Sequence, residues 1–139
     1  MPGSRWPVAV SDDDFAPYLA GAPRESTDLF WRFIALARDC GPVTFELQRP
    51  GIVLRGTRRI FASAGIGRTS LQGHIVLPRP LPGDKRIYKV SPLTKRLFGN
   101  WYKVKSDRDL DQEFADWLRA ARDVGDGAHL ARGAGEDGS

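Results

Sequence analysis

Six short apolar or alternating segments fill the middle of this chain, and glycine, proline or basic residues separate each from the next. Such segments are typical of β-strands, because no apolar period of about 3.6 residues runs through them. Their short links favour hairpins, so we expect a largely antiparallel meander. The five or six expected strands are Val43–Gln48, Ile52–Thr57, Ile60–Ile66, Leu71–Leu77, Ile87–Ser91 and Leu97–Val104.

Two amphipathic segments flank the expected strands. Ser26–Cys40 has Ser26 as its N-cap and ends before Gly41-Pro42, which is a helix stop signal. Asp107–Val124 follows Ser106 as N-cap and has an acidic first turn, where the helix dipole favours negative charge. The order of a helix, a run of strands and a second helix predicts an α+β fold with both helices packed on one face of the sheet.

Alternation within the strands predicts which side chains share a face. In Ile60–Ile66, Ala62 and Ala64 fall on one face, where small side chains let a helix pack closely, and Phe61 and Ser63 fall on the other. We expect a single domain over residues 25–124. Residues 1–24 lack a sustained apolar period and should be loosely attached, and the glycine-rich residues 125–139 should be disordered.

Charge is segregated along the chain. Residues 43–105 hold 13 Lys/Arg against 2 Asp/Glu, a net charge of +11, whereas residues 1–42 carry −2 and residues 106–139 carry −5. Either the acidic ends fold against the basic middle and neutralise it, or the middle offers a positive surface to an anionic partner. The sequence also leaves open whether the acidic N-terminal residues mask the sheet.

Many of the basic residues alternate with apolar ones, so they can share the sheet face opposite the helices. Arginine and lysine beside aromatic rings is the composition that grooves for single-stranded nucleic acid use. Alternatively, these are solvated strand positions and edge lysines that suppress aggregation between sheets. The candidate ligand-binding residues are Arg55, Arg58, Arg59, Arg68, His74, Lys89, Trp101 and Lys103.

No residue spacing typical of an enzyme or a metal site is present. The expected strands and their links hold only Glu46 and Asp84 as carboxylates, too few to converge on a divalent ion. Nothing in the sequence places a catalytic partner beside His74 or Cys40. We therefore expect no metal, no cofactor and no catalytic residue, and a pocket that held His74 beside a carboxylate or Cys40 would reopen the question.

The cellular context follows from what the sequence lacks. Cys40 is the only cysteine, which excludes an intramolecular disulfide, and Met1–Val10 lacks the apolar stretch of a secretory signal. No apolar run approaches the roughly 18 residues of a membrane-spanning helix. We expect a soluble cytoplasmic protein with no membrane partner.

Several segments resemble a bacterial family that is catalogued only as a domain of unknown function. The resemblance spans about Leu29 to Val124 and implies the same α+β domain. Members often stand behind a short helical domain, and some relatives carry the label of predicted transport protein. They usually have one or two histidines just before the final strand, where this chain has Asn100 and Trp101. The segments that carry the resemblance are Ala35–Thr44, Arg59–Ala62, Val76–Pro80, Arg86–Val90, Asp109–Asp111 and Trp117–Ala121.

Three functions remain open on the sequence, of which the third, an enzyme, has no residue spacing that places two titratable groups together. The first is a small binding module whose basic sheet surface takes an anionic ligand, either nucleic acid or a phosphorylated molecule. The second is a protein-interaction or homo-oligomerisation domain, in which an exposed Trp101 face or an edge strand pairs with another chain.

Overall fold

The computed structural model describes residues 7–48 and 51–128. It has the expected α+β fold, one antiparallel sheet with helices packed on it. The elements in chain order are β1 (Val8–Ala9), the 3₁₀ helix η1 (Asp12–Phe15), α1 (Ala16–Leu19), α2 (Arg24–Asp39), β2 (Thr44–Leu47), β3 (Gly51–Arg55), β4 (Ile60–Ile66), β5 (Leu71–Leu77), β6 (Ile87–Pro92), β7 (Phe98–Val104), the 3₁₀ helix η2 (Asp107–Asp109) and α3 (Gln112–Gly125).

The sheet has seven strands in the order β1-β2-β3-β4-β5-β7-β6. The number exceeds the five or six expected because the two-residue strand β1 pairs with β2. The meander is also interrupted, since β7 inserts between β5 and β6 and leaves β6 at the edge. The loop between β5 and β6 therefore passes the place that β7 occupies. The buried Asn100 side chain of β7 holds this loop by accepting a 2.8 Å hydrogen bond from the Leu81 N–H.

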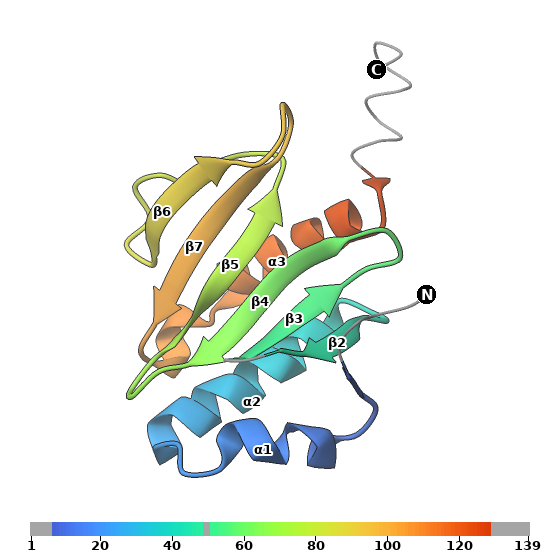
Figure 1. Ribbon diagram of the computed structural model, residues 1–139. Helices are drawn as coiled ribbons and strands as arrows, with labels where there is room; N and C mark the ends of the chain where they lie inside the picture. Colours follow the sequence, from blue (N-terminus) through green and yellow to red (C-terminus); the bar gives the residue numbers. More distant parts are fainter. Residues whose placement is uncertain (1–6, 49–50, 129–139) are drawn as a thin grey trace.

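Helices α2 and α3 pack against one face of the sheet, over β4 and β5, and no helix covers the other face within the described residues (Figure 1). Ala62 and Ala64 are buried in the core, as their small size predicted. Phe61 departs from strict alternation. The register of β3 and β4 shifts between Leu54 and Arg55, and Phe61 is buried close to Gly125 of α3.

Helix α2 begins two residues before the expected start. Its N-cap is Pro23, so the assignment of Ser26 as N-cap was wrong. Ser26 is buried, and its hydroxyl donates to the carbonyls of Gly67 (2.8 Å) and Arg68 (3.0 Å) in the β4–β5 turn. The stop signal is confirmed, because Gly41 adopts a φ of 114°, which disfavours other residues.

The expected helix over 107–124 is two elements. Ser106 precedes only the short η2, and Leu110 has a ψ of 63°, which ends that turn before α3 begins. The Asp111 carboxylate caps α3 by accepting the Phe114 N–H at 3.0 Å, so Asp111 replaces Ser106 as the N-cap. Helix α3 then runs to Gly125, with Phe114, Trp117 and Leu118 on its buried face.

Residues 7–24 depart from the loose attachment expected of 1–24. Phe15 is fully buried and meets Phe30, Trp31 and Phe45 edge to face. A single aromatic side chain carries no periodicity, so an apolar Phe15 did not by itself predict that the segment packs on the domain. Of the tail expected at 125–139, Gly125 ends α3 and is buried, and residues 129–139 lie outside the described residues.

Candidate anion-binding face

A row of side chains crosses the uncovered face of the sheet. Ser63 of β4 contacts His74 of β5, and His74 lies opposite Trp101 of β7, which in turn lies opposite Lys89 of β6. Gln72 and Lys103 form the next cross-strand pair on the same face. We call this surface the open face, and its members are Ser63, Gln72, His74, Lys89, Trp101 and Lys103.

His74 is fixed by two hydrogen bonds to Ser63. The Ser63 Oγ accepts the backbone N–H of His74 at 3.0 Å and lies 2.6 Å from Nδ1 of the same residue. Burial, with a smaller contribution from the charge of Arg59, lowers the pKa of His74 below 6.5, so the ring is neutral at pH 7. Because the Ser63 Oγ already accepts one N–H, we infer that the hydroxyl donates its hydrogen bond to Nδ1. The hydrogen of the neutral imidazole is then on Nε2.

Trp101 forms the aromatic centre of the open face. Its indole stacks on the His74 ring with 5.7 Å between centroids and 29° between planes, and Lys89 Nζ lies 4.8 Å from the centroid of the indole. The ring lies over Gly99, where a Cβ would come within 2.6 Å of it. The indole is half-buried, so part of this ring stays accessible for stacking.

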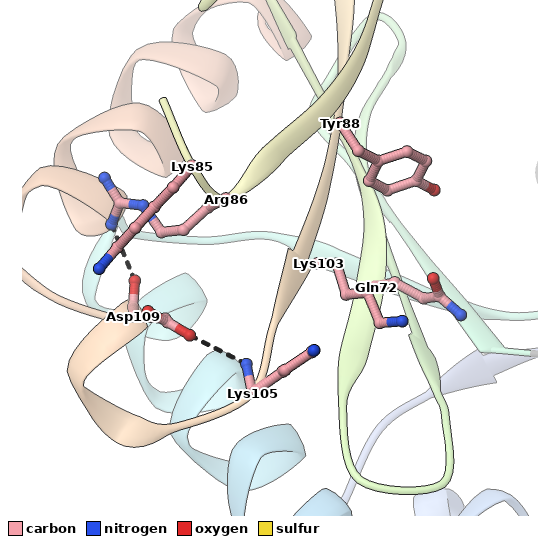
Figure 2. Close-up of a pocket in the computed structure, with 7 residues that line it drawn as sticks. All are labelled: Gln72, Lys85, Arg86, Tyr88, Lys103, Lys105 and Asp109. Atoms are coloured by element: carbon pink, nitrogen blue, oxygen red, sulfur yellow. Dashed lines mark hydrogen bonds between the residues drawn. The ribbon is translucent and has the colours of Figure 1, made fainter. Parts of the chain in front are cut away.

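A recess of about 640 Å³ continues the open face toward the β6 edge. In Figure 2, Gln72 and Lys103 reach the same way, whereas the Arg86 guanidinium turns toward Asp109. No ion pair joins Lys85, Lys103 or Lys105 to any residue that the structure describes. The residues that line the recess are Gln72, Lys85, Arg86, Tyr88, Lys103, Lys105 and Asp109.

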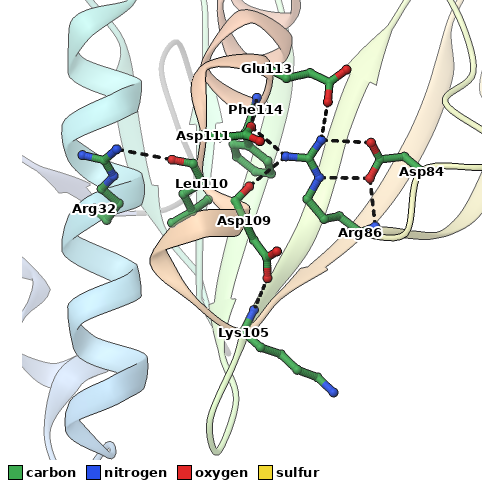
Figure 3. Close-up of polar contacts among 9 residues, drawn as sticks. All are labelled: Arg32, Asp84, Arg86, Lys105, Asp109, Leu110, Asp111, Glu113 and Phe114. Carbon is green, nitrogen blue, oxygen red and sulfur yellow. Dashed lines mark hydrogen bonds and ion pairs between the residues drawn. The ribbon is translucent and has the colours of Figure 1, made fainter.

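The positive charge of Arg86 is compensated by carboxylates inside the fold. Figure 3 shows its guanidinium among the carboxylates of Asp84 (2.9 Å), Asp111 (2.8 Å) and Glu113 (2.6 Å), and it also donates to the Asp109 carbonyl. Its face packs on Trp117, 4.4 Å from the ring centroid. The hydrogen bond from Arg86 lowers the pKa of Asp84. Burial alone would raise the pKa of Asp111, but hydrogen bonds from the Phe114 N–H and from Arg86 outweigh it and the pKa is lowered.

Charge compensation is therefore divided between the two layers of the molecule. The acidic start of α3 neutralises Arg86, and Asp12 of η1 pairs with Arg38 of α2 at 2.7 Å, on the helical side. None of the described N-terminal carboxylates forms an ion pair with an open-face lysine. Arg86 is thus compensated internally, whereas Lys89 and Lys103 form no ion pair with a described residue, and the binding of an anionic partner stays a prediction.

The structure separates the eight candidate residues. His74, Lys89, Trp101 and Lys103 meet on the open face, and Arg59 lies close enough for its charge to act on His74. The other three do not join this group. Arg55 pairs at 2.5 Å with the buried Glu46, Arg58 packs beside Gly127 after α3, and Arg68 lies in the β4–β5 turn near Ser26.

Five residues of the candidate site are not among the eight sequence candidates: Ser63, Gln72, Lys85, Tyr88 and Lys105. Alternation assigns Ser63 to this face, and Tyr88 and Lys105 alternate with apolar residues in expected strands, so those three had a signal. Gln72 had the same signal, because it alternates with His74 in Leu71–Leu77, whereas Lys85 lies in a link between expected strands, where alternation assigns no face. Tyr88 has 59% of its surface exposed, beside a register shift in β6.

The face places one serine, Ser63, within hydrogen-bond reach of His74, the kind of partner that nucleophilic catalysis needs. Among the described residues, no carboxylate hydrogen-bonds to His74, and no group of three or more His, Cys, Asp or Glu side chains is placed to hold a metal. Cys40 does not belong to the open face. Its thiol, at the end of α2, donates to the Leu36 carbonyl, and burial raises the pKa of this thiol. The arrangement is suited to hold anions and flat rings.

Comparisons of the chain with protein-family models, with curated proteins and with solved structures find no match. The resemblance to an uncharacterised bacterial family therefore stays a prediction. Within the described residues, no helix has the length and apolar character needed to cross a membrane.

Proposed function

We propose that the open face binds single-stranded nucleic acid. One observation carries the proposal: a half-buried indole on β7 stacks on a neutral imidazole and has beside it Lys89 of β6 and Lys103 of β7, which form no ion pair with described residues. Bases stack on aromatic rings whatever their sequence, and lysines beside them neutralise phosphates.

A single strand suits this face better than a duplex. The bases of a duplex are stacked on one another and cannot lie on Trp101, whereas the bases of a single strand can be splayed onto a sheet. Lys89 of β6 is the cross-strand neighbour of the ring, Lys103 lies two residues from Trp101 along β7, and Lys85 and Lys105 line the adjoining recess. Phosphates next to a stacked base therefore have cationic partners.

The test is a fluorescence-anisotropy titration with labelled single-stranded DNA, single-stranded RNA and duplex DNA of about 12 nucleotides, within the usual site sizes of such grooves. We expect single strands to bind more tightly than the duplex, and binding to weaken steeply between about 50 and 200 mM salt, because phosphate neutralisation releases counterions. Absence of binding at low salt, or binding that does not change with salt, would refute the proposal.

A second candidate function is association with another protein chain through the β6 edge. The observation that favours it is the exposure of Tyr88 (59%) and Leu93 (42%) in or directly after this edge strand. An edge strand with exposed apolar groups can pair with another chain. Light scattering distinguishes the two functions, because edge pairing between copies predicts a dimer mass in the absence of nucleic acid.

A further inference from the structure

Next to the open face lies a slot of about 260 Å³ above β3, β4 and β5. It adjoins the lysine-lined recess, since Gln72 lines both. Gly51, Val53 and Gly65 contribute to its lining, and Gln48, Ser63, Gln72 and His74 contribute polar side chains.

Gly65 has no evident role in the fold. A Cβ at this position would meet nothing closer than the Gln72 carbonyl oxygen at 3.6 Å, an ordinary contact, and the φ of Gly65 lies outside the left-handed region. The register is regular on both sides, with Gly51 and Gln72 as cross-strand partners, so no bulge requires glycine. Glycine weakens a strand interior and often marks a place where a ligand approaches the backbone.

Polar groups around the slot are unused. Neither the side-chain amide of Gln48 nor that of Gln72 hydrogen-bonds to a described residue, and the same is true of His74 Nε2. A carboxamide presents one acceptor and two donors, the combination that reads the edge of a nucleobase. A bare backbone with hydrogen-bonding groups around it is chemically matched to a flat heterocycle.

We propose that the slot over Gly65 receives one unstacked base of the strand bound on the open face. The inference rests on the proposed function and adds a base-reading subsite to it. The phosphates on either side of this base face Lys103 and the recess, because Gln72, which lines both cavities, is the cross-strand partner of Lys103.

The experiment fills the slot. Gly65→Val adds a β-branched side chain that suits a strand and projects into the cavity, and Gly65→Ala is the smaller step. The probes are a labelled single-stranded oligonucleotide and an abasic oligonucleotide of the same length. Ala35→Val is the matched control, since it adds apolar bulk at an exposed position of α2 on the other layer.

We expect Gly65→Val to weaken binding of the normal oligonucleotide about tenfold, the effect of excluding one base from its site. Binding of the abasic oligonucleotide should not change, and Ala35→Val should bind both as the wild type does. Thermal unfolding should show Gly65→Val no less stable than the wild type. If Gly65→Val does not fold, Gly65→Ala and Gln72→Ala must show the same selective loss.

The outcomes separate this inference from the proposed function. Normal affinity of folded Gly65→Val for the base-containing strand overturns the slot as a base site and leaves the open face intact. An equal loss for both probes also overturns it, because the variant then acts on phosphate binding. A wild type that binds neither probe overturns the proposed function together with this inference.

Discussion

The Ser63 hydroxyl lies 2.6 Å from Nδ1 of His74 and also accepts the backbone N–H of that residue, so one side chain of β4 fixes both the ring and the strand position of its neighbour. The link orients a neutral imidazole against Trp101. Burial of this ring, with a smaller contribution from the charge of Arg59, lowers the pKa of His74 and makes its protonation costly in the folded state.

The free energy of unfolding should decrease as pH is lowered through the range where histidine titrates. The pKa of His74 is lowered from 6.5, chiefly by burial and secondarily by Arg59, so the unfolded chain binds a proton that the native state resists. The stabilisation is complete above 6.5 and is lost as pH falls toward the lower native pKa. Urea unfolding of the wild type and His74→Gln across this range should show the decline in the wild type alone, and parallel curves would contradict it.

Removal of either open-face lysine should reduce the salt dependence of nucleic-acid binding. For a single strand, each phosphate that is no longer neutralised changes the slope of log K against log salt by about 0.7. Lys89→Ala and Lys103→Ala should each show this change. Arg119→Ala removes the same charge from the exposed side of α3, where Arg119 pairs with Asp116, and should leave the slope as in the wild type. A slope equally reduced in all three variants would indicate a general charge effect.

Loss of the indole at position 101 should weaken binding through stacking. Trp101→Leu keeps an apolar cover over Gly99 but removes the π face, and we expect a loss of about 1–3 kcal/mol, the contribution of one stacked base. Trp101→Phe should retain part of the affinity. The control is Trp31→Phe, because Trp31 packs against Phe15 on the helical side. Anisotropy titrations at one salt concentration compare the three, and an unchanged Trp101→Leu would contradict stacking.

The sequence predicted best what depends on local periodicity. The limits of β4 and β5 agree with Ile60–Ile66 and Leu71–Leu77, because alternation, glycine and turn residues are all local signals. The same alternation placed His74, Lys89, Trp101 and Lys103 among the candidates that can share a face. Once these strands are paired in register, their side chains meet without further information.

What the sequence did not predict depends on contacts between distant residues. Asp84 is a local partner for Arg86, but the sequence does not indicate that Arg86 also meets Asp111 and Glu113 at the α3 N-terminus and is buried there. The exchange of β6 and β7 likewise depends on Asn100 holding the loop at Leu81. The slot over Gly65 was not foreseen because glycine in a strand has several explanations, and only the surrounding atoms decide among them.

Arg86→Met should destabilise the fold. Removing one member of a buried ion-pair network costs about 3–5 kcal/mol, and we expect the lower end of this range because Asp111 and Glu113 are half-exposed and can regain water. Arg119→Met, at an exposed pair, should cost at most about 1 kcal/mol. Urea unfolding measures both, and similar losses would contradict the network.

The same network predicts a response to acid. The pKa values of Asp84 and Asp111 are lowered from 3.8, so their contribution to stability is present above that pH and is lost as pH falls through the native values. The wild type should therefore lose stability in strong acid more steeply than Arg86→Met. Equal slopes in the two proteins would show that Arg86 does not hold these carboxylates.

Alanine substitution should have opposite effects on the free energy of unfolding at two glycines of neighbouring strands. At Gly73 a Cβ would lie 2.1 Å from the Ser63 carbonyl oxygen, which accepts a 2.7 Å hydrogen bond from the Tyr102 hydroxyl, so β4 and β5 must separate and that bond must weaken. Overpacking of this kind costs about 1–3 kcal/mol. A Cβ at position 65 makes only an ordinary contact, 3.6 Å from the Gln72 carbonyl oxygen, so Gly65→Ala should stabilise the strand by about 0.5–1 kcal/mol, because alanine loses less backbone entropy on folding. Urea unfolding of the two variants measures both effects. Destabilisation by Gly65→Ala as large as that by Gly73→Ala would mean that the fold itself requires glycine at position 65, and the slot would lose its argument for a ligand.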